Sequence, residues 1–318
     1  MNSLNRRAML KLAAAGTAAG VMGSRDAQTF GLPLGLQAKD QRVGCSLEGT
    51  VRDRFWMWGH EAGSHNTVKD KSQWPYCCDY GIPKNSRMTP AEGAFYMGIP
   101  NVLLIRYGKR PEAPFHQFAL SLSPFKRVVW SITGDGGRTE GEDEVVKARE
   151  LLGQFPNFCG VIMDDFFREA TADQVAVFTP DQLRKIKELL GHTPLWVTLY
   201  TELLDHSDRI SEHIQLMDKI TLWTWKGSDL VHLENNFQKL EKLAPAASKV
   251  MGCYLWNYGE KKPIPVSLME RQSELGLKWL KSGKIDEMIF LSNNVVDLGL
   301  ENVEWTRNWI RQVGDQKL

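Results

Sequence analysis

The 318-residue chain lacks long apolar runs, an excess of charge of one sign, and internal repeats. Its Ala/Gly-rich stretch at residues 12–22 is shorter than the roughly 20 apolar residues that a membrane-spanning helix needs. Lys and Arg (39) balance Asp and Glu (38), so the net charge of +1 gives no broad attraction to nucleic acid or to an anionic membrane. The hydrophobic fraction of 42% is ordinary for a globular protein. We therefore expect a single domain with no nucleic-acid partner.

Cysteine is also scarce, with five residues, and none of them belongs to a CxxC pair. This spacing does not match a zinc site. An odd number leaves at least one thiol unpaired, unless a partner chain supplies another. We expect a disulfide between Cys45 and either Cys77 or Cys78. We expect Cys159 and Cys253, which fall in predicted strands, to be buried like apolar residues.

The N-terminus resembles a bacterial twin-arginine export signal. Arg6 and Arg7 precede an apolar residue and a lysine, and the Ala/Gly-rich stretch follows, so the basic, apolar and small-residue regions come in the expected order. We expect residues 1–27 to be the signal peptide, 28–50 a linker and 51–318 the catalytic domain. The protein would then be periplasmic or secreted, with no membrane contact after signal removal. The alternative is a frayed N-terminal helix of a cytoplasmic enzyme.

The chain does contain eight short apolar runs, most of which stop at a polar or charged residue. Amphipathic helical stretches separate most of them, and this alternation predicts an α/β fold, a (β/α)8 TIM barrel. Catalytic residues of that fold lie at the C-terminal ends of the strands, so the polar endings are candidate site residues. The runs are Arg54–His60, Asn101–Arg106, Arg127–Thr133, Cys159–Asp165, Pro194–Tyr200, Lys219–Trp225, Lys249–Asn257 and Glu287–Asn293.

Two helices between these runs have clear start signals. Residues 89–92 (TPAE) and 179–182 (TPDQ) each place a threonine at the N-cap and a proline at the first helical position. A final helix containing Trp305 and Trp309 is expected to pack on the outside of the barrel.

The strongest catalytic candidates are Asp164 and Asp165, at the end of the fourth run. Carboxylates directly after a buried strand are costly unless they are used or paired. Since neighbours on a regular strand point to opposite faces, at most one of the two is expected to aim straight into the barrel mouth. The alternative is structural: one carboxylate caps the next helix and the other pairs with Arg168.

Glu202 lies two residues beyond the end of the fifth run. Adjacent strands are about 5 Å apart, so Glu202 can approach the two aspartates. Two carboxylates across a cleft suit glycosidic hydrolysis, in which one protonates the leaving oxygen and the other attacks the sugar or activates water. A surface position at a helix start is the alternative for Glu202.

Tryptophan is abundant, with 11 residues, and most of them fall within the predicted strands. Flat aromatic faces stack on the C–H face of a pyranose. The rings nearest the strand ends, Trp58, Tyr200, Trp225 and Tyr258, are therefore candidate sugar contacts. The alternative is that most of these rings fill the barrel or the layer beneath the helices.

Six further polar residues at or near strand ends are candidate substrate contacts. Arg106 offers a planar fork for a carboxylate or two hydroxyls, or else forms a salt bridge with Asp135 or Glu61 that holds the rim. His60 and Glu61 could supply a proton shuttle or a second carboxylate. The set is His60, Glu61, Arg106, Asp135, Asn257 and Asn293.

These features together resemble the broad class of (β/α)8 glycoside hydrolases. The resemblance rests on the fourth run with its ending at residues 160–167 (GVIMDDFF), on Glu202 beyond the fifth run, and on the tryptophans at strand ends. It implies an exported enzyme that cleaves a glycosidic bond of a carbohydrate substrate, using Asp164 or Asp165 together with Glu202. No metal or other cofactor is expected.

Two other functions fit the same pattern. A metal-dependent sugar isomerase or epimerase would use the many acidic strand ends, although His60 is the one histidine at a predicted strand tip. A barrel that binds carbohydrate without catalysis would use the aromatic rings alone. The Asn-Glu pair that many barrel glycosidases carry after the fourth strand is absent from the sequence, as is the DxxDxDxE run of chitinase-like barrels.

Overall fold

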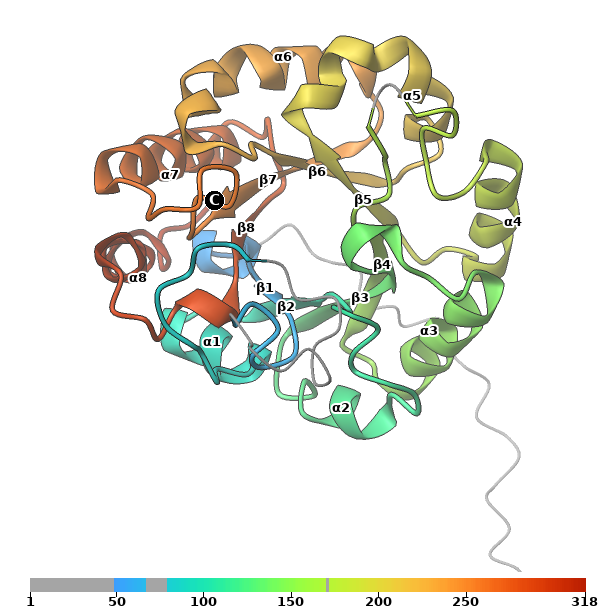
Figure 1. Ribbon diagram of the computed structural model, residues 1–318, viewed down its shortest axis with the longest axis horizontal. Coiled ribbons are helices and arrows are strands. Elements are labelled where there is room, and N and C mark those ends of the chain that lie inside the picture. Colours follow the sequence, from blue (N-terminus) through green and yellow to red (C-terminus); the bar gives the residue numbers. More distant parts are fainter. Residues whose placement is uncertain (1–48, 67–78, 170–171) are drawn as a thin grey trace, which may run out of the picture. The chain divides into compact units, whose positions relative to one another are not determined.

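The computed structural model of the protein describes residues 49–66, 79–169 and 172–318. Eight parallel strands follow one another around a closed barrel, and β1 pairs with both β2 and β8 (Figure 1). Each strand overlaps one of the eight apolar runs, and the predicted (β/α)8 barrel is confirmed. The strands are β1 Phe55–Gly59, β2 Asn101–Leu104, β3 Arg127–Thr133, β4 Phe158–Met163, β5 Leu195–Tyr200, β6 Lys219–Trp223, β7 Ser248–Tyr254 and β8 Glu287–Leu291.

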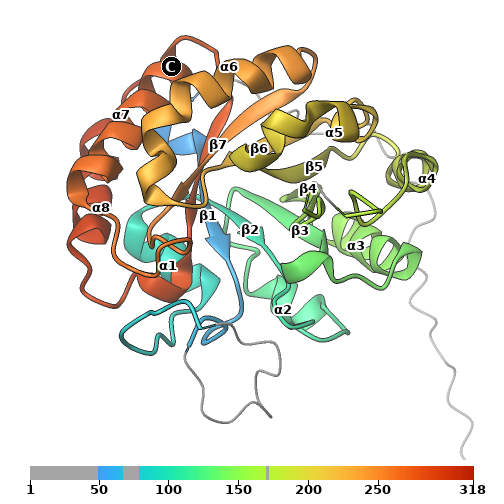
Figure 2. The ribbon, with the colours of Figure 1, turned by 45° about the horizontal axis from the view of Figure 1, so that its top comes forward.

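An α-helix follows every strand, and the helices form a ring outside the barrel (Figures 1 and 2). They are α1 Pro90–Met97, α2 His116–Leu120, α3 Glu142–Gln154, α4 Pro180–Leu190, α5 Ser207–Ile214, α6 Leu233–Leu243, α7 Val266–Lys281 and α8 Glu301–Val313. Short 3-10 helices are η2 Val51–Arg54, η3 Asp135–Gly137, η4 Thr201–His206, η5 Gly227–His232 and η6 Asn293–Val295.

The predicted helix starts are confirmed at α1 and α4. Thr89 Oγ1 accepts a hydrogen bond from the Glu92 N–H at 3.2 Å, and the Glu92 side chain accepts one from the Thr89 N–H at 2.9 Å. Thr179 and Gln182 make the same reciprocal pair at α4. Each pair satisfies N–H groups that a helix start otherwise leaves without partners.

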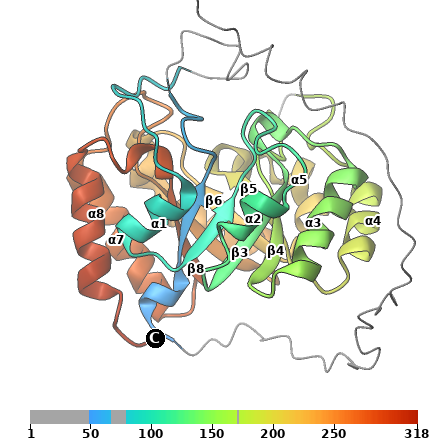
Figure 3. The same cartoon turned by 90° about the horizontal axis from the view of Figure 1, so that it is seen from below.

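The first and last described segments meet at the N-terminal end of the barrel. Thr50 and Lys317 form an antiparallel bridge, and the Val51 N–H donates to the Gln316 carbonyl at 2.9 Å. Figure 3 shows the C-terminus beside the start of the described chain, away from the described residues that follow β1.

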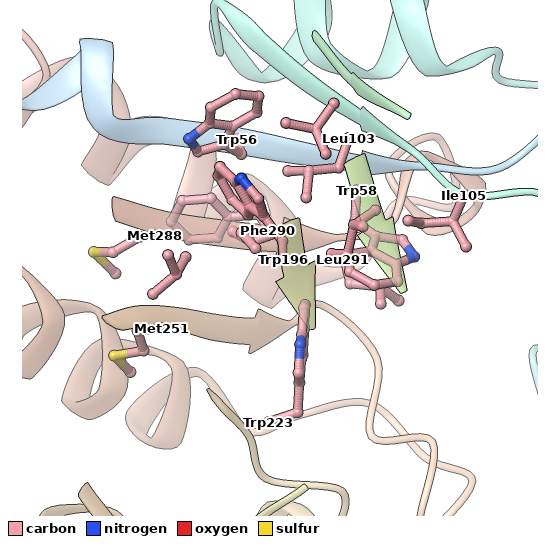
Figure 4. Close-up of a cluster of buried hydrophobic side chains, with 14 of the residues drawn as sticks. Trp56, Trp58, Leu103, Ile105, Trp196, Trp223, Met251, Met288, Phe290 and Leu291 are labelled. Atoms are coloured by element: carbon pink, nitrogen blue, oxygen red, sulfur yellow. The ribbon is translucent and has the colours of Figure 1, made fainter. Parts of the chain in front are cut away.

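Indole rings fill the barrel interior and meet across it. Trp56 of β1 and Trp196 of β5 lie on opposite strands with ring centroids 5.3 Å apart, and Trp58 meets Trp223 of β6 at 5.1 Å. Figure 4 shows these rings in one buried cluster. A Cβ at Gly252 of β7 would lie 2.3 Å from the Trp223 ring, so a glycine is needed there. This packing leaves the strand ends as the place for a binding site.

A buried ionic cluster closes the N-terminal end of the interior. Glu287 of β8 accepts hydrogen bonds from Arg127 of β3 at 2.5 Å and from Lys219 of β6 at 2.9 Å. The cations also lie over indole rings, Arg127 over Trp56 at 4.6 Å and Lys219 over Trp196 at 4.5 Å. Burial alone would raise the pKa of Glu287, but Lys219 and Arg127 outweigh it and lower the pKa.

The expected signal peptide and nearly all of the linker lie outside the described residues, as do Cys45, Cys77 and Cys78. Cys253 is buried in β7 and Cys159 is half-buried in β4. In the described part of the chain, no helix has both the length and the apolar character that crossing a bilayer requires.

Candidate active site

A cavity of about 310 Å³ lies at the C-terminal ends of the strands. This volume is typical of a small-molecule site. Nine of the residues expected from the sequence line it: Trp58, His60, Asp135, Asp164, Asp165, Tyr200, Glu202, Trp225 and Tyr258. The rest of the lining is His65, Tyr80, Tyr107, Thr198, Trp223, Tyr254 and Leu291.

Asp164 follows the last residue of β4 and faces the cavity from a buried position. Thr198 Oγ1 of β5 donates to its Oδ1 at 3.3 Å, and Thr133 Oγ1 of β3 donates to its backbone carbonyl at 2.7 Å. Burial raises the pKa of the Asp164 carboxyl well above its usual range, and the charges of Asp165 and Asp135 raise it further. Asp164 is therefore suited to hold a proton at a pH where an ordinary aspartate has lost it.

Asp165 lines the same cavity because the backbone leaves the strand geometry at this residue. Its φ is +42°, in the left-handed region, so the alternation of strand faces no longer applies. The Tyr200 hydroxyl donates to Oδ1 at 2.7 Å and the Gly136 N–H donates to Oδ2 at 2.8 Å. A Cβ at Gly137 would lie 2.8 Å from the Asp165 carbonyl oxygen, so this close approach also requires glycine. The expectation that at most one aspartate aims straight into the mouth applies to a regular strand, but β4 ends at Met163, before both aspartates.

Asp135 begins η3, directly after β3, and is the third aspartate in the cavity wall. The Gly108 N–H donates to its Oδ1 at 2.7 Å, and Arg138 forms an ion pair with its Oδ2. Burial raises the pKa of Asp135, against the lowering effects of the Gly108 N–H and the Arg138 charge. Asp135 is thus fixed by the loop that also supplies the Gly136 N–H to Asp165.

Glu202 reaches the cavity from η4, the segment that continues β5. Its side chain is exposed, in contrast to that of Asp164. The carboxylates of β4 and β5 therefore share one cavity, with Asp164 at the buried side and Glu202 at the open side.

Aromatic rings form the rest of the wall. Trp225 and Tyr258 stack with centroids 5.9 Å apart and an interplanar angle of 23°, and Tyr254 meets the edge of Trp225 at 5.8 Å. Tyr200 lies on another side of Trp225 at 6.1 Å. Trp58, packed against Trp223, lines the cavity from the barrel interior. Such faces suit contact with the C–H groups of a sugar ring.

His60 is held as a neutral ring. Trp58 Nε1 donates to its Nε2 at 3.0 Å, so its Nδ1 is the nitrogen that carries the proton and donates to the Ile105 carbonyl at 3.0 Å. Burial lowers the pKa of His60 to about 4. Both ring nitrogens are occupied, so this geometry does not support the expected proton shuttle.

Two of the expected polar contacts do not line the cavity and form ion pairs instead. Arg106 forms a buried ion pair with Glu144 of α3, and its Nε donates to the Pro111 carbonyl at 3.1 Å. Glu61 is half-buried, with Arg110 at 3.8 Å. The salt bridge expected between Arg106 and Asp135 or Glu61 is therefore wrong: Arg106 pairs with Glu144, while Asp135 and Glu61 pair with Arg138 and Arg110.

The two expected asparagines hold the backbone. Asn293 Oδ1 accepts from the His60 N–H at 2.9 Å, and its Nδ2 donates to the His60 carbonyl at 3.0 Å. Asn257 Oδ1 accepts from the Gly227 N–H at 3.1 Å, and its Nδ2 donates to Glu260. Neither is among the residues that line the cavity.

Thr198 and Tyr254 line the cavity but were not among the expected site residues. Their signal is strand alternation: Thr198 precedes Tyr200 by two residues, as Trp223 precedes Trp225, so the two residues of each pair share a face. Tyr254 is the last residue of β7, just as Tyr200 is the last residue of β5 and Trp223 the last residue of β6. His65 and Tyr80 come from the loop after β1, for which no periodicity exists.

The described residues contain no group of three His, Cys, Asp or Glu side chains placed to hold one metal ion. No family model matches the chain, and no curated protein matches it either.

Solved structures share the barrel. The structure of a candidate α-L-fucosidase from Bacteroides thetaiotaomicron is 10% identical, with a TM-score of 0.53 over 83% of this chain and 96% of that chain. Active domain 2 of a thermostable chitinase from Pyrococcus furiosus is 14% identical (TM-score 0.49; 79% and 86% covered), and an aldolase named QR15 is 13% identical (0.44; 82% and 96%). The chain thus shares its barrel fold with the fucosidase structure. At these identities the likeness establishes the fold and not the activity.

Proposed function

We propose that the protein is a hydrolase that cleaves a glycosidic bond in this cavity. The observation that carries the proposal is the convergence of Asp164, Asp165 and Glu202 on one cavity with aromatic walls, at the catalytic end of the barrel. Glycosidic hydrolysis needs a protonated acid on one side of the sugar and a carboxylate on the other.

Asp164 is the proposed acid. It is buried, burial and two neighbouring aspartates raise its pKa, and Thr198 orients its carboxyl group. A carboxyl group that stays protonated near neutral pH can give its proton to the leaving oxygen as the bond breaks.

Asp165 and Glu202 supply the negative charge. Asp165 is fixed by the Tyr200 hydroxyl and the Gly136 N–H, so its carboxylate is positioned to stabilise the positive charge that develops on the sugar ring. Glu202 lies at the open side, where water enters, and is the proposed base that activates this water.

The test is to incubate the purified full-length protein with a panel of oligosaccharides and to measure hydrolysis by the release of reducing ends. Asp164→Asn and Glu202→Gln should each lower kcat by about 10²–10⁴-fold. Asp143→Asn, an exposed position on α3, is the matched control and should keep full activity. Turnover that survives Asp164→Asn would contradict the proposal.

The same panel separates the two other functions. A protein that only binds carbohydrate would show saturable binding with no release of reducing ends from any member. An isomerase or epimerase that depends on a metal would lose activity on dialysis against a chelator and regain it with one divalent ion. The proposed hydrolase keeps its rate through both steps.

We also propose that the protein is exported through the twin-arginine route. Arg6, Arg7 and the Ala/Gly-rich stretch at 12–22 support this proposal. Cell fractionation should find the protein in the periplasm or medium, and the double change Arg6→Lys and Arg7→Lys should retain it in the cytoplasm. If the unmodified protein and the double variant were found in the same cell fractions, this would argue against the twin-arginine route.

A further inference from the structure

The charge of the cavity wall is strongly one-sided. Four carboxyl groups line it, from Asp135, Asp164, Asp165 and Glu202, and none of the lining residues in the described chain is a lysine or an arginine. In the proposed reaction Asp164 holds a proton, so the negative charge of the wall comes from Asp165, Glu202 and the Arg138-paired Asp135. Clefts of one sign with low-dielectric walls concentrate ligands of the opposite charge.

Three of these four groups have no ion-pair partner within residues 49–66, 79–169 and 172–318: Asp164, Asp165 and Glu202. Asp135 is the exception, because Arg138 pairs with it from behind the wall. Elsewhere in the described chain the buried acids Glu144 and Glu287 are both paired with cations. The cavity is therefore the place where negative charge is left for a ligand to neutralise.

The two histidines of the wall do not offset this charge. Burial lowers the pKa of His60 to about 4, and burial together with the nearby His60 lowers the pKa of His65 well below its usual range. These lowered pKa values favour the neutral form of both rings.

The aromatic wall suits a cation as well. Trp225 makes an edge contact with Tyr200 at 6.1 Å, and the Tyr200 hydroxyl donates to Asp165, so an indole ring and a carboxylate both contact the same tyrosine in the cavity wall. Glu202 follows Tyr200 by two residues. An ammonium group between an aromatic face and a carboxylate gains from both, especially where water is excluded.

We propose that the saccharide bound in this cavity carries a free primary amine, and that sugars bearing carboxylate or sulfate groups are rejected. This inference rests on the proposed function, since it names the substrate class of the same site. The amine is protonated when it binds, and its charge faces Asp165 and Glu202, the carboxylates that have no ion-pair partner among the described residues. An N-acetylated sugar of the same shape lacks this charge and binds more weakly.

The experiment measures binding by calorimetry to the full-length Asp164→Asn variant, which cannot turn the ligand over. Asparagine has the shape and charge of a protonated aspartic acid, so the variant keeps the charge that the proposed acid has in the resting enzyme. The probes are tetramers of glucosamine and of galactosamine, their N-acetylated forms, and a tetramer of galacturonic acid. At least one amine tetramer should bind tenfold or more tightly than its N-acetylated form, and this advantage should shrink between 50 and 500 mM salt. The acidic tetramer should not bind.

A second variant tests the charge of the wall without touching the proposed catalytic groups. Arg138→Gln removes the cation that neutralises Asp135 and should increase the preference for the amine, while Arg138→Lys keeps the charge and should leave the preference unchanged. Equal binding of amine and N-acetylated tetramers would overturn the inference and leave the hydrolase proposal standing. Absence of binding and of cleavage for every saccharide would overturn both.

Discussion

The two ends of the barrel interior both bury acidic side chains, but they treat them in opposite ways. At the N-terminal end, Glu287 accepts hydrogen bonds from Arg127 and Lys219, and its pKa is lowered. At the C-terminal end, Asp164 has a hydroxyl from Thr198 and two acidic neighbours, and its pKa is raised. One acid is neutralised by the protein, and the other is left to be neutralised by a proton or a ligand.

This difference separates stability from function within one fold. A buried carboxylate with paired cations is strongly destabilised when one partner is lost. A buried carboxyl group with acidic neighbours costs stability while it waits for substrate, and natural proteins accept such costs mainly at functional sites. The comparison can be tested by removing one acid at each end and measuring both activity and stability.

The largest effect on rate is expected from Asp164→Asn at the C-terminal end. Loss of the proposed acid lowers kcat by about 10²–10⁴-fold. The free energy of unfolding at neutral pH should not fall, because the change removes a buried acid next to Asp165 and Asp135. Urea denaturation of the variant and of the Asp143→Asn control measures this. A clear loss of stability without loss of rate would reverse the assignment of the two ends.

Glu287→Gln should have the opposite pattern. It leaves the half-buried Arg127 and Lys219 without their negative partner, and breaking a buried ion pair in this way costs about 3–5 kcal/mol. Activity per folded molecule should stay near that of the unmodified protein, since the cluster lies at the far end of the barrel. Glu188→Gln, an exposed position on α4, is the control for the denaturation series. A stability equal to that of the control would show that the cluster contributes little.

Tyr200→Phe should have a smaller effect on rate than Asp164→Asn. The change removes the hydroxyl that donates to Asp165 at 2.7 Å and keeps the ring beside Trp225. A hydrogen bond to a charged group is worth about 1.5–3 kcal/mol, so we expect kcat to fall by roughly 10- to 100-fold with little change in KM. Tyr96→Phe removes a hydroxyl that donates to Glu304 away from the cavity, and it should leave kcat unchanged. A rise in KM alone would instead assign Tyr200 to substrate binding.

The smallest expected effect is a difference in the pH dependence of stability. Glu287 has a lowered pKa when folded, so its contribution is present above the usual glutamate pKa and is lost as the pH falls below about 4. Asp164 has a raised pKa when folded, so its protonated form favours folding below the usual aspartate pKa, and that contribution is lost as the pH rises towards the folded value. In Glu287→Gln, the denaturation midpoint should no longer fall as the pH drops below about 4. In Asp164→Asn, the midpoint should no longer fall as the pH rises above the usual aspartate pKa. Parallel curves for the two variants would contradict the comparison.

The sequence predicts the barrel well because strand and helix periods are local. All eight strands overlap the apolar runs, and the N-cap threonines Thr89 and Thr179 are where the short motifs place them. The candidate acids Asp164, Asp165 and Glu202 are equally local, because each lies within two residues of the end of a strand.

Other parts of the site depend on contacts that strand patterns do not contain. Arg106 ends beside Glu144, a residue of α3 that lies 38 positions later, and nothing in the strand ending indicates this partner. Asn293 serves the backbone of His60, from the opposite end of the chain. Asp165 enters the cavity through a positive φ, which a sequence of two aspartates does not specify.

The bridge between Thr50 and Lys317 has a practical consequence for work with this protein. Because the chain finishes at the closed base of the barrel, an affinity tag or surface anchor attached after Leu318 points away from the mouth. Protein immobilised in this way should leave the cavity open to ligands, whereas attachment at Tyr80, which lines the cavity, would obstruct it.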